Sequence, residues 1–425
     1  MTRPGKRSRY PRRIAMLSVH TCPLAALGGK ETGGMNVYVR ELSRELGARG
    51  LVVDIYTRSQ DAARDRIVHP WPNVRVIHLP AGPEEPYSKN LVFSHLPEFL
   101  SGMEAMAEQE GITYDVLHSH YWLSGWVARE FSRRHSVPTV HMFHTLGKMK
   151  DTVARSPEEK ETDVRIQVES ELVSSLDRII AATPLDRQQT IELYGAAPDR
   201  IRVIPLGVDP EMFHPIPQAE ARRAIGLDLP GVCRLVLFVG RLDPLKGLDT
   251  LVRAMCKLTD LEPELVKGTC LAVIGGDVDE DSDALENEIE CLDKLKKEVG
   301  LDDLVVFLGS RAQDTLAQYY SAAEVVVVPS HYESFGLVAL EAMACGAPVI
   351  ASRVGGLMHT IEDNVTGLLV PAGDPDALAD KLRQVLLDAD LRERLGANAR
   401  AHALTYTWPN VAEQIIQVYE ELCKS

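Results

Sequence analysis

A short stretch in the second half of the chain combines two cations with flanking glycines. It runs Gly240-Arg241-Leu242-Asp243-Pro244-Leu245-Lys246-Gly247 and follows an apolar run, 235–239, that is typical of a buried strand. Arg241 and Lys246 would therefore lie where that strand ends. Two cations so placed suit two oxygens of a diphosphate group. Taken alone, the pair is also compatible with ordinary surface charges on a solvated loop.

A second stretch places two carboxylates around the start of a helix. It runs Glu333-Ser334-Phe335-Gly336-Leu337-Val338-Ala339-Leu340-Glu341 and follows the apolar run 325–329. With Phe335 and Gly336 opening a helix, Glu333 lies in the loop and Glu341 about two turns further along. The two carboxylates could then contact different parts of one ligand. Glu341 is equally compatible with a partly exposed helix position that binds nothing.

The first half of the chain contains a glycine-rich turn after its first apolar run. Gly28, Gly29, Gly33 and Gly34 precede residues 35–46, which have helical spacing. Unpaired backbone N–H groups and the positive end of the helix dipole make such a turn a common phosphate site, and the glycines are equally compatible with a turn that is merely tight. The spacing lacks the G-x-G-x-x-G pattern of dinucleotide enzymes, which disfavours a dehydrogenase even though Asp54 lies near the expected acidic position.

The elements that must position these residues alternate between strands and helices. Short apolar runs that are hydrophobic throughout recur between helical patterns, as expected for strands covered on both faces of a parallel sheet. These runs are 13–19, 52–57, 74–79, 115–120, 139–144, 179–183 and 201–205 in the first half, and 235–239, 271–274, 304–308, 325–329, 348–351 and 367–370 in the second. The sequence therefore predicts an α/β protein with two doubly wound, Rossmann-like sheets.

At 425 residues the chain is longer than one hydrophobic core usually supports, which favours two domains. Four prolines between 207 and 231 indicate a linker, so we expect a first domain over 1–209 and a second over 210–404. A final helix within 405–425, predicted from its helical spacing, would return to the first domain. We expect the two sheets to face each other across a cleft, because such sheets bind ligands beyond the carboxyl ends of their strands.

Together these motifs resemble those of the family-four retaining glycosyltransferases, which have the GT-B fold. The resemblance covers nearly the whole chain and rests on Gly-Arg-Leu-x-x-x-Lys-Gly at 240–247, the two glutamates of 333–341, and Pro348-Val349-Ile350-Ala351 followed by Gly355-Gly356. It implies an enzyme that moves a hexosyl group from a nucleotide-diphosphate sugar, with UDP as the favoured nucleotide, to a small acceptor. Neither a cofactor nor a catalytic metal is implied.

The resemblance also implies a role for each matching residue. Arg241 and Lys246 would stabilise the charge that builds on the leaving diphosphate. Glu333 would hold hydroxyls of the transferred sugar, and Glu341 would hold the ribose. His144 would lie beside the reacting sugar, although the residue alone is better explained as a buried structural histidine. The remaining donor contacts would come from Gly34, Arg311, Phe335, Gly336 and Leu337, of which Arg311 is also typical of an ordinary surface loop.

The acceptor would be chosen by the first domain. The segments Gly33-Gly34-Met35-Asn36-Val37-Tyr38 and His118-Ser119-His120-Tyr121-Trp122-Leu123-Ser124-Gly125 look like those of the inositol-phosphate N-acetylglucosaminyltransferases of mycothiol synthesis. That likeness implies a phosphorylated acceptor whose phosphate is held by Lys89, Tyr121, Thr145 and Arg165. Asn36 would meet ring hydroxyls, and Lys150 is a further basic candidate.

Three alternatives stay open. Sucrose-phosphate synthases of the same family also bind a phosphorylated acceptor, fructose 6-phosphate, through basic residues such as Lys89, Lys150 and Arg165. They usually carry Gln where this chain has Met35, and Met cannot hydrogen-bond a fructosyl hydroxyl as Gln does. A UDP-sugar epimerase or a non-catalytic nucleotide-sugar-binding protein would use a related fold.

The remaining composition excludes several classes of protein. A formal net charge of -15 disfavours nucleic acid as a partner, and no apolar run approaches a membrane span. Seven scattered cysteines without a C-x-x-C pair are typical of reduced thiols in a cytoplasm. Asp277-Val278-Asp279 mimics a metal-binding D-x-D but lies in a longer acidic stretch, so we expect no metal there. Six basic residues between Arg3 and Arg13 predict a disordered tail, with contact to anionic lipid as the alternative, and a homodimer stays open.

Overall fold

The computed structural model describes residues 10–25, 32–154, 157, 160–227, 234–276 and 305–424. The chain forms two compact units. Unit 1 comprises the residues up to Ala25, Gly34–Pro205 and Trp408–Ser425, and unit 2 comprises Leu206–Thr407 with the segment ending at Gly33. The chain passes from one unit to the other between Pro205 and Leu206, whereas the sequence analysis set the boundary at residue 209.

Unit 1 is built on an eight-stranded sheet in the order β3-β4-β2-β1-β5-β6-β7-β8. Its strands are β1 Arg13–Leu17, β2 Val52–Arg58, β3 Ile67–Trp71, β4 Val74–Leu79, β5 Val116–His120, β6 Thr139–Met142, β7 Arg178–Ala181 and β8 Ile201–Val203. All neighbours pair in parallel except β3 and β4. The order reverses between β1 and β5, which is the switch point at which doubly wound sheets bind ligands.

The sequence analysis did not predict β3. Its sequence, Ile-Val-His-Pro-Trp, contains a proline, and all of its residues are at least partly exposed. Proline is tolerated on an edge strand because its missing N–H is not needed there. The strand is therefore stable only as an antiparallel addition to β4, and it lacks the uniformly apolar signal of the buried parallel strands.

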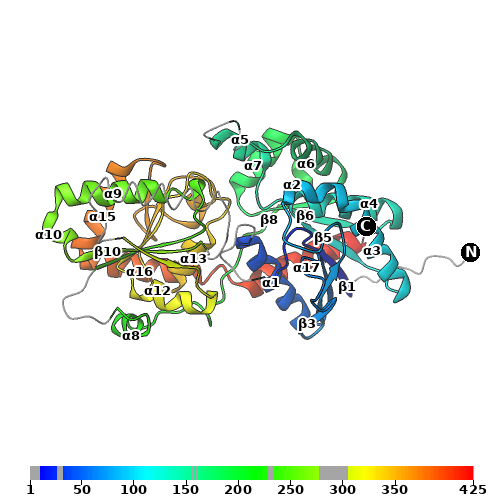
Figure 1. Cartoon of the computed structure of the whole chain (residues 1–425), viewed down its shortest axis with the longest axis horizontal. Helices are drawn as coiled ribbons and strands as arrows, with labels where there is room; N and C mark the ends of the chain where they lie inside the picture. The colour runs from blue at the N-terminus through cyan, green and yellow to red at the C-terminus, as the bar shows by residue number, and fades with distance from the viewer. Residues whose placement is uncertain are drawn as a thin grey trace, which may run out of the picture. The chain divides into compact units, whose positions relative to one another are not determined.

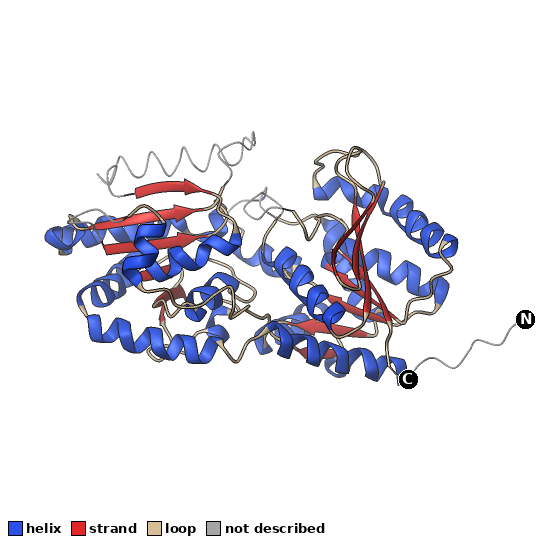
Figure 2. Cartoon of the chain, turned by 90° about the horizontal axis from the view of Figure 1, so that it is seen from below, coloured by secondary structure: helices blue, strands red, loops and turns tan. Residues whose placement is uncertain are grey.

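Helices cover both faces of this sheet, as Figure 2 shows. They are α1 Gly34–Ala48, α2 Lys89–Val92, α3 Leu96–Gln109, α4 Tyr121–His135, α5 Gly147–Val153, α6 Asp163–Ser175 and α7 Pro184–Tyr194, with the short turns η1 Phe93–His95 and η3 Pro198–Arg200. Helix α7 shows how local sequence sets a boundary: the Thr183 hydroxyl accepts from the N–H of Asp186, and Gly195 ends the helix in a left-handed conformation.

Unit 2 is built on a six-stranded parallel sheet in the order β11-β10-β9-β12-β13-β14. The strands are β9 Arg234–Val239, β10 Thr269–Ile274, β11 Val305–Gly309, β12 Val325–Val328, β13 Val349–Ser352 and β14 Leu368–Val370. The helices are α8 Gln218–Ala224, α9 Leu248–Leu261, α10 Pro263–Val266, α12 Leu316–Ala322, α13 Leu337–Ala344, α14 Leu357–Thr360, α15 Pro375–Leu387 and α16 Ala389–Ala403, with η4 Pro244–Lys246 and η5 Gln313–Thr315. The switch point lies between β9 and β12, each of which leads into one of the two predicted donor motifs.

The last helix, α17 (Trp408–Lys424), belongs to unit 1. In Figure 1 it is the red helix beside the blue α1. Its apolar face is buried, and the hydroxyl of Tyr419 lies 2.6 Å from Nδ1 of His118 on β5. The ring of Trp408 meets the edge of Tyr38 on α1. The return of the final helix to the first sheet agrees with the sequence prediction. Among the described residues, no helix is both long and apolar enough to cross a membrane.

Candidate functional site

Arg165 is the most constrained side chain among the predicted acceptor residues. It lies in the first turn of α6, and its side chain is only 1% exposed. Nη1 donates to the Tyr121 hydroxyl at 3.0 Å, and Nη2 donates to the Thr145 hydroxyl at 3.1 Å. The guanidinium also lies 4.8 Å from the centre of the Tyr121 ring. Three residues that the sequence analysis assigned to one phosphate, far apart in the chain, therefore meet around one cation.

Glu169, one turn further along α6, fixes the guanidinium of Arg165. Nε of Arg165 donates to Oε1 of Glu169 at 2.7 Å, and both side chains are buried. The other oxygen of Glu169 accepts from the N–H of Gly147 at 2.9 Å and from the hydroxyl of Tyr194. A Cβ on Gly147 would lie 2.7 Å from Ile166, so glycine at this position allows the close approach. Glu169 thus anchors Arg165 to α5 and α7.

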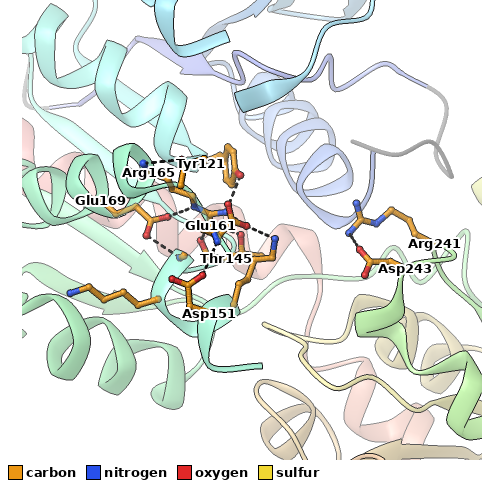
Figure 3. Close-up of polar contacts among 12 residues, drawn as sticks. Tyr121, Thr145, Asp151, Glu161, Arg165, Glu169, Arg241 and Asp243 are labelled. Carbon is orange, nitrogen blue, oxygen red and sulfur yellow. Dashed lines mark hydrogen bonds and ion pairs between the residues drawn. The ribbon is translucent and has the colours of Figure 1, made fainter. Parts of the chain in front are cut away.

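Glu161, just before α6, contacts the outer side of the same cation. Its Oε1 lies 2.9 Å from Nη1 of Arg165 and also accepts from Nζ of Lys150. The Glu161 side chain is 8% exposed. Burial alone raises the pKa of this carboxyl, but the charges of Arg165 and Lys150 outweigh it and the pKa is lowered. Figure 3 shows Glu161 among Arg165, Tyr121 and Thr145.

Lys89, the fourth predicted phosphate contact, lies at the start of α2. The charges of Lys89 and Arg165 both act on His20, which follows β1 and whose ring centre lies 4.5 Å from that of Tyr121 in a tilted arrangement. Burial is the main cause of the lowered pKa of His20, about 3, and these two cations and His144 lower it further. His20 was not singled out from the sequence, yet it lies close to three of the predicted acceptor residues, Lys89, Tyr121 and Arg165.

The turn between β1 and α1 shows one difference from the sequence analysis. Asn36 is fully buried, and its amide nitrogen donates to the Thr21 hydroxyl and the Cys22 carbonyl, both at 2.8 Å. Both N–H groups of the Asn36 amide therefore donate to atoms of the chain itself and are not directed at hydroxyls of a bound sugar ring. Gly34 begins α1 and is exposed; no described atom lies within 4 Å of the place a Cβ would take, so its N–H can be approached.

His144 and Tyr121 both have strained backbones. Their φ angles are +61° and +72°, in the left-handed region that bulky side chains rarely adopt. Such strain persists only where the surroundings enforce it, and it concentrates at functional sites. Tyr121 directly follows β5 and His144 lies two residues after the end of β6, so both are at the carboxyl ends of strands of unit 1. This placement gives His144 a physical distinction that its sequence context alone does not provide.

His144 is half-buried and contacts a group of buried histidines. Its Nε2 lies 3.0 Å from Nδ1 of His120, and the other nitrogen of His120, Nε2, lies 2.8 Å from the sulfur of Met16. Burial lowers the pKa of His144 to about 3 and that of His120 well below 6.5, so both rings are neutral at neutral pH. Each ring therefore carries one N–H and one lone pair.

The contact with the sulfur of Met16 indicates which ring nitrogen carries each proton. Because a thioether can only accept, we assign the N–H of His120 to Nε2 and the lone pair to Nδ1. That lone pair requires a donor, which makes Nε2 of His144 an N–H as well. Nδ1 of His144 is then an unprotonated acceptor, and no residue in the described part of the chain hydrogen-bonds to it. His144 thus offers a hydrogen-bond acceptor suited to a hydroxyl group.

The two donor-site cations of unit 2 lie in the connection after β9. Lys246 ends η4 and its Nζ lies 2.6 Å from Oε2 of Glu333. Arg241 lies 3.3 Å from Asp243, and its side chain is 38% exposed. Gly247, with φ +67°, packs so tightly that a Cβ would lie 2.2 Å from the carbonyl of Pro329 after β12. The structure therefore brings together Lys246 and Glu333, which are 87 residues apart.

Two glycines after β13 support the loop that carries Glu333. The N–H of Gly356 donates to the carbonyl of Glu333 at 2.8 Å, and a Cβ on Gly355 would lie 1.9 Å from that same oxygen. Gly336, with φ +95°, caps α13, which begins at Leu337, and Phe335 is buried. Without side chains at these positions, the loop can fold back on itself and hold Glu333 in place.

The remaining donor-site predictions lie on α13 and in the loop after β11. Glu341, buried, is the fifth residue of α13 and accepts from the Tyr320 hydroxyl at 2.9 Å and from Gln313 at 2.8 Å. It therefore lies just over one turn into the helix, not about two turns beyond Glu333. Arg311 donates to the hydroxyl of Tyr319 at 3.1 Å. Asp277 and Asp279 fall outside the described residues, as do Gly28 and Gly29.

Models of two known families match almost the whole chain in succession. Residues 33–207 match the Glycosyl transferase 4-like domain, and residues 227–402 match Glycosyl transferases group 1. These matches lie within unit 1 and unit 2 respectively, apart from a few residues at the boundaries.

Individual proteins resemble the chain over nearly its full length. A D-inositol 3-phosphate glycosyltransferase of Saccharomonospora viridis is 42% identical over 97% of this chain and 94% of its own. The protein of that name from Acidothermus cellulolyticus is 43% identical over 97% of this chain and 90% of its own. Among solved structures, a sucrose-phosphate synthase from Thermosynechococcus elongatus superimposes with a TM-score of 0.88 at 37% identity, over 97% of this chain and 99% of its own.

The proton assignment in the histidine group predicts a spectroscopic result. In long-range ¹H–¹⁵N spectra at neutral pH, Nδ1 of His144 should appear as the unprotonated nitrogen and Nε2 as the N–H. His120→Asn places a side-chain oxygen near the position of the His120 Nδ1, so Nε2 of His144 keeps an acceptor and the pattern should be preserved. His120→Phe removes that acceptor and should allow both tautomers of His144. A His144 protonated at Nδ1 in the wild-type protein would contradict the assignment.

The buried histidines predict loss of stability in mild acid. The folded pKa values of His20, His118 and His144 are lowered from 6.5 to about 3, with burial as the first cause of each. Their contribution to stability is therefore complete above pH 6.5 and is lost as the pH falls toward 3. Between pH 6.5 and about 3, each of these three histidines should lower the free energy of unfolding by about 1.4 kcal/mol for every unit that the pH falls.

The measurement is urea unfolding followed by tryptophan fluorescence at several pH values between about 7.5 and about 5. All 4 tryptophans of the chain, Trp71, Trp122, Trp126 and Trp408, lie in unit 1, which also contains the histidines. The fluorescence midpoint should fall steadily with pH. A midpoint that stays constant down to about pH 5 would show that these rings take up protons without unfolding.

Proposed function

Because this chain belongs to the family-four glycosyltransferases of the GT-B fold, it transfers glycosyl groups, and we propose that inositol phosphate is its acceptor. We further propose a nucleotide-diphosphate hexose, with UDP as the nucleotide, as the donor. The observation that carries the acceptor proposal is the meeting of Arg165, Tyr121 and Thr145 around one buried guanidinium. The similarity of the whole chain to D-inositol 3-phosphate glycosyltransferases supports the same acceptor.

The chemistry of this group suits a phosphate better than a neutral hydroxyl. The guanidinium of Arg165 offers planar, charged donors, Lys150 offers a second cation, and the hydroxyls of Tyr121 and Thr145 offer further hydrogen bonds. Lys89 adds positive charge on the side of His20. The positive charges of this group would compensate the negative charge of a phosphate dianion, whereas an uncharged acceptor would gain only weaker hydrogen bonds there.

On the donor side, Arg241 and Lys246 would bind the diphosphate and stabilise the charge that develops as the glycosidic bond breaks. Glu333 would bind hydroxyls of the hexose, and Glu341, already hydrogen-bonded to Tyr320, would hold the ribose. Lys246 now pairs with Glu333, so a diphosphate would exchange one anionic partner of this lysine for another. The backbone N–H of Gly34 would contact a phosphate oxygen at the start of α1.

We propose that transfer retains the donor's anomeric configuration and needs no metal. The acceptor hydroxyl would attack from the face that the diphosphate leaves, and a donor phosphate oxygen would take its proton. His144, neutral and with a lone pair on Nδ1, would accept a hydrogen bond from the transferred sugar and would not act as a nucleophile. The two cations of unit 2 would supply the positive charge that a metal provides in other glycosyltransferases.

A sucrose-phosphate synthase activity is the second candidate, supported by the similarity to the Thermosynechococcus elongatus enzyme. The same cations could bind the phosphate of fructose 6-phosphate. Met35, which packs partly buried against the core of unit 1, argues against this candidate because its thioether cannot replace a glutamine in holding a fructosyl hydroxyl.

One assay separates these candidates. Nucleotide release is measured with several UDP-, GDP- and ADP-sugars against inositol phosphate, fructose 6-phosphate and their unphosphorylated forms, with and without EDTA. We expect inositol phosphate with a UDP-sugar to react fastest, unphosphorylated acceptors to react poorly, and EDTA to have no effect. Product NMR should show a retained anomeric centre. A preference for fructose 6-phosphate would establish the second candidate, and loss of activity in EDTA or an inverted product would overturn the proposed mechanism.

Substitution of the donor-site cations should mainly lower the chemical rate. Arg241→Ala and Lys246→Ala should each lower kcat by roughly 10²- to 10³-fold, because each charge acts most strongly on the developing diphosphate. Lys257→Ala is the matched control, since this lysine of unit 2 pairs with Asp376 at the surface. It should leave kcat nearly unchanged. If Lys246→Ala instead raises the KM for the donor at constant kcat, the lysine binds the ground state and transition state equally.

A further inference from the structure

The anion site of unit 1 already holds a carboxylate of the chain itself. One oxygen of Glu161, Oε1, contacts both Nη1 of Arg165 and Nζ of Lys150. A single oxygen bridging two cations is the arrangement expected of a bound phosphate oxygen. Figure 3 shows this carboxylate on the same side of Arg165 as the Tyr121 ring. Glu161 therefore occupies the position that an acceptor's phosphate would need.

The charges of this site are balanced without a ligand. Lys150 and Arg165 carry two positive charges, and Glu161 and Glu169 carry two negative charges. Every nitrogen of the Arg165 guanidinium has a protein partner: Nε contacts Glu169, Nη1 contacts Tyr121 and Glu161, and Nη2 contacts Thr145. A phosphate dianion entering beside an ionised Glu161 would meet a like charge in a buried site, which is unfavourable.

Of the two carboxylates that contact Arg165, only that of Glu161 can move away at a low cost in free energy. Glu169 is fully buried and is held by Arg165, by the N–H of Gly147 and by Tyr194. Within the described part of the chain, the carboxylate of Glu161 contacts only the two cations, and its main-chain N–H is held separately by Asp151 at 2.8 Å. Rotation of the Glu161 side chain would free both cations while its backbone stays in place.

We propose that Glu161 is a built-in competitor for the anionic group of the acceptor. In the free protein it neutralises Lys150 and Arg165, and a phosphorylated acceptor displaces it, so its carboxylate sets the affinity for that acceptor. This proposal rests on the proposed function in placing the acceptor's phosphate at Arg165. It adds that binding is an exchange of one anion for another, in which two ion pairs of Glu161 are lost.

The test compares Glu161→Gln with the wild type in binding inorganic phosphate, measured by calorimetry, and in the KM for inositol phosphate. Glutamine has the same size but no charge, so the competitor is weakened while the cations remain. Phosphate should bind roughly 10- to 100-fold more tightly, and the KM should fall in the same direction. Glu171→Gln is the matched control, because Glu171 lies on the same helix and pairs with Arg129 away from this site. It should change neither quantity.

Weaker phosphate binding by Glu161→Gln would show that the carboxylate helps to hold the ligand, and unchanged binding would show that it plays no part; either result overturns the proposal. If Glu161→Gln does not fold, Glu161→Asp provides the test, because the shorter side chain keeps its charge but reaches the cations less well. Glu161→Asp should bind phosphate more tightly than the wild type, and equal or weaker binding would overturn the proposal in the same way.

The phosphate-binding measurement and the KM measurement together distinguish a failure of this proposal from a failure of the proposed function. Should the wild type use inositol phosphate while Glu161→Gln raises its KM, the function stands and the competitor is rejected. Should the wild type ignore every phosphorylated acceptor while Glu161→Gln binds inorganic phosphate more tightly, the competitor stands and the acceptor is rejected.

Discussion

The buried positive charge of Arg165 is the constraint around which the acceptor side of unit 1 is arranged. An uncompensated guanidinium with 1% exposure would be very unfavourable, so carboxylates and hydroxyls must surround it. The partners come from α4, the connection after β6, and α6 itself, while Glu169 ties the group to Gly147 and Tyr194. One charge thereby fixes the relative positions of several helices. Its requirement for anionic partners also prepares the site for an anionic ligand.

Both units pair the cations that are predicted to bind ligands with carboxylates of the chain itself. In unit 1, Lys150 and Arg165 pair with Glu161, and in unit 2, Lys246 pairs with Glu333. The free protein thus avoids leaving strong positive charges without partners in partly buried places. Ligand binding at such a site exchanges ion pairs, and its net free energy is the difference between the old and new partners. This moderates affinity, and it disfavours any ligand that cannot replace the negative charge it displaces.

Much of the fold could be predicted from the sequence because buried parallel strands are uniformly apolar. The predicted runs correspond to the observed strands, and β3 was missed because its partly polar sequence with Pro70 is stabilised only by pairing with β4. The meeting of Lys246 and Glu333 was also predictable, since both lie in short segments with distinctive spacing that follow neighbouring strands; their role in binding a donor stays a prediction. The partners of Arg165 were harder to predict: Glu161 and Glu169 look like ordinary helix-surface glutamates until the tertiary structure buries them. The hydrogen bonds of the Asn36 amide nitrogen within the preceding turn could not be predicted either, because they depend on how that turn folds.

The return of α17 to unit 1 has a consequence for the order in which the protein is made. Unit 2 is almost continuous in the chain, from Leu206 to Thr407, and is complete before the last helix has been synthesised. Unit 1 lacks Trp408 and Tyr419 until then, so Tyr38 and His118 have no partners from α17 on the growing chain. Domains usually fold in the order of their synthesis. Here unit 1, which begins before unit 2 on the ribosome, must be the last to close its core, and its histidine group stays open until α17 has been made.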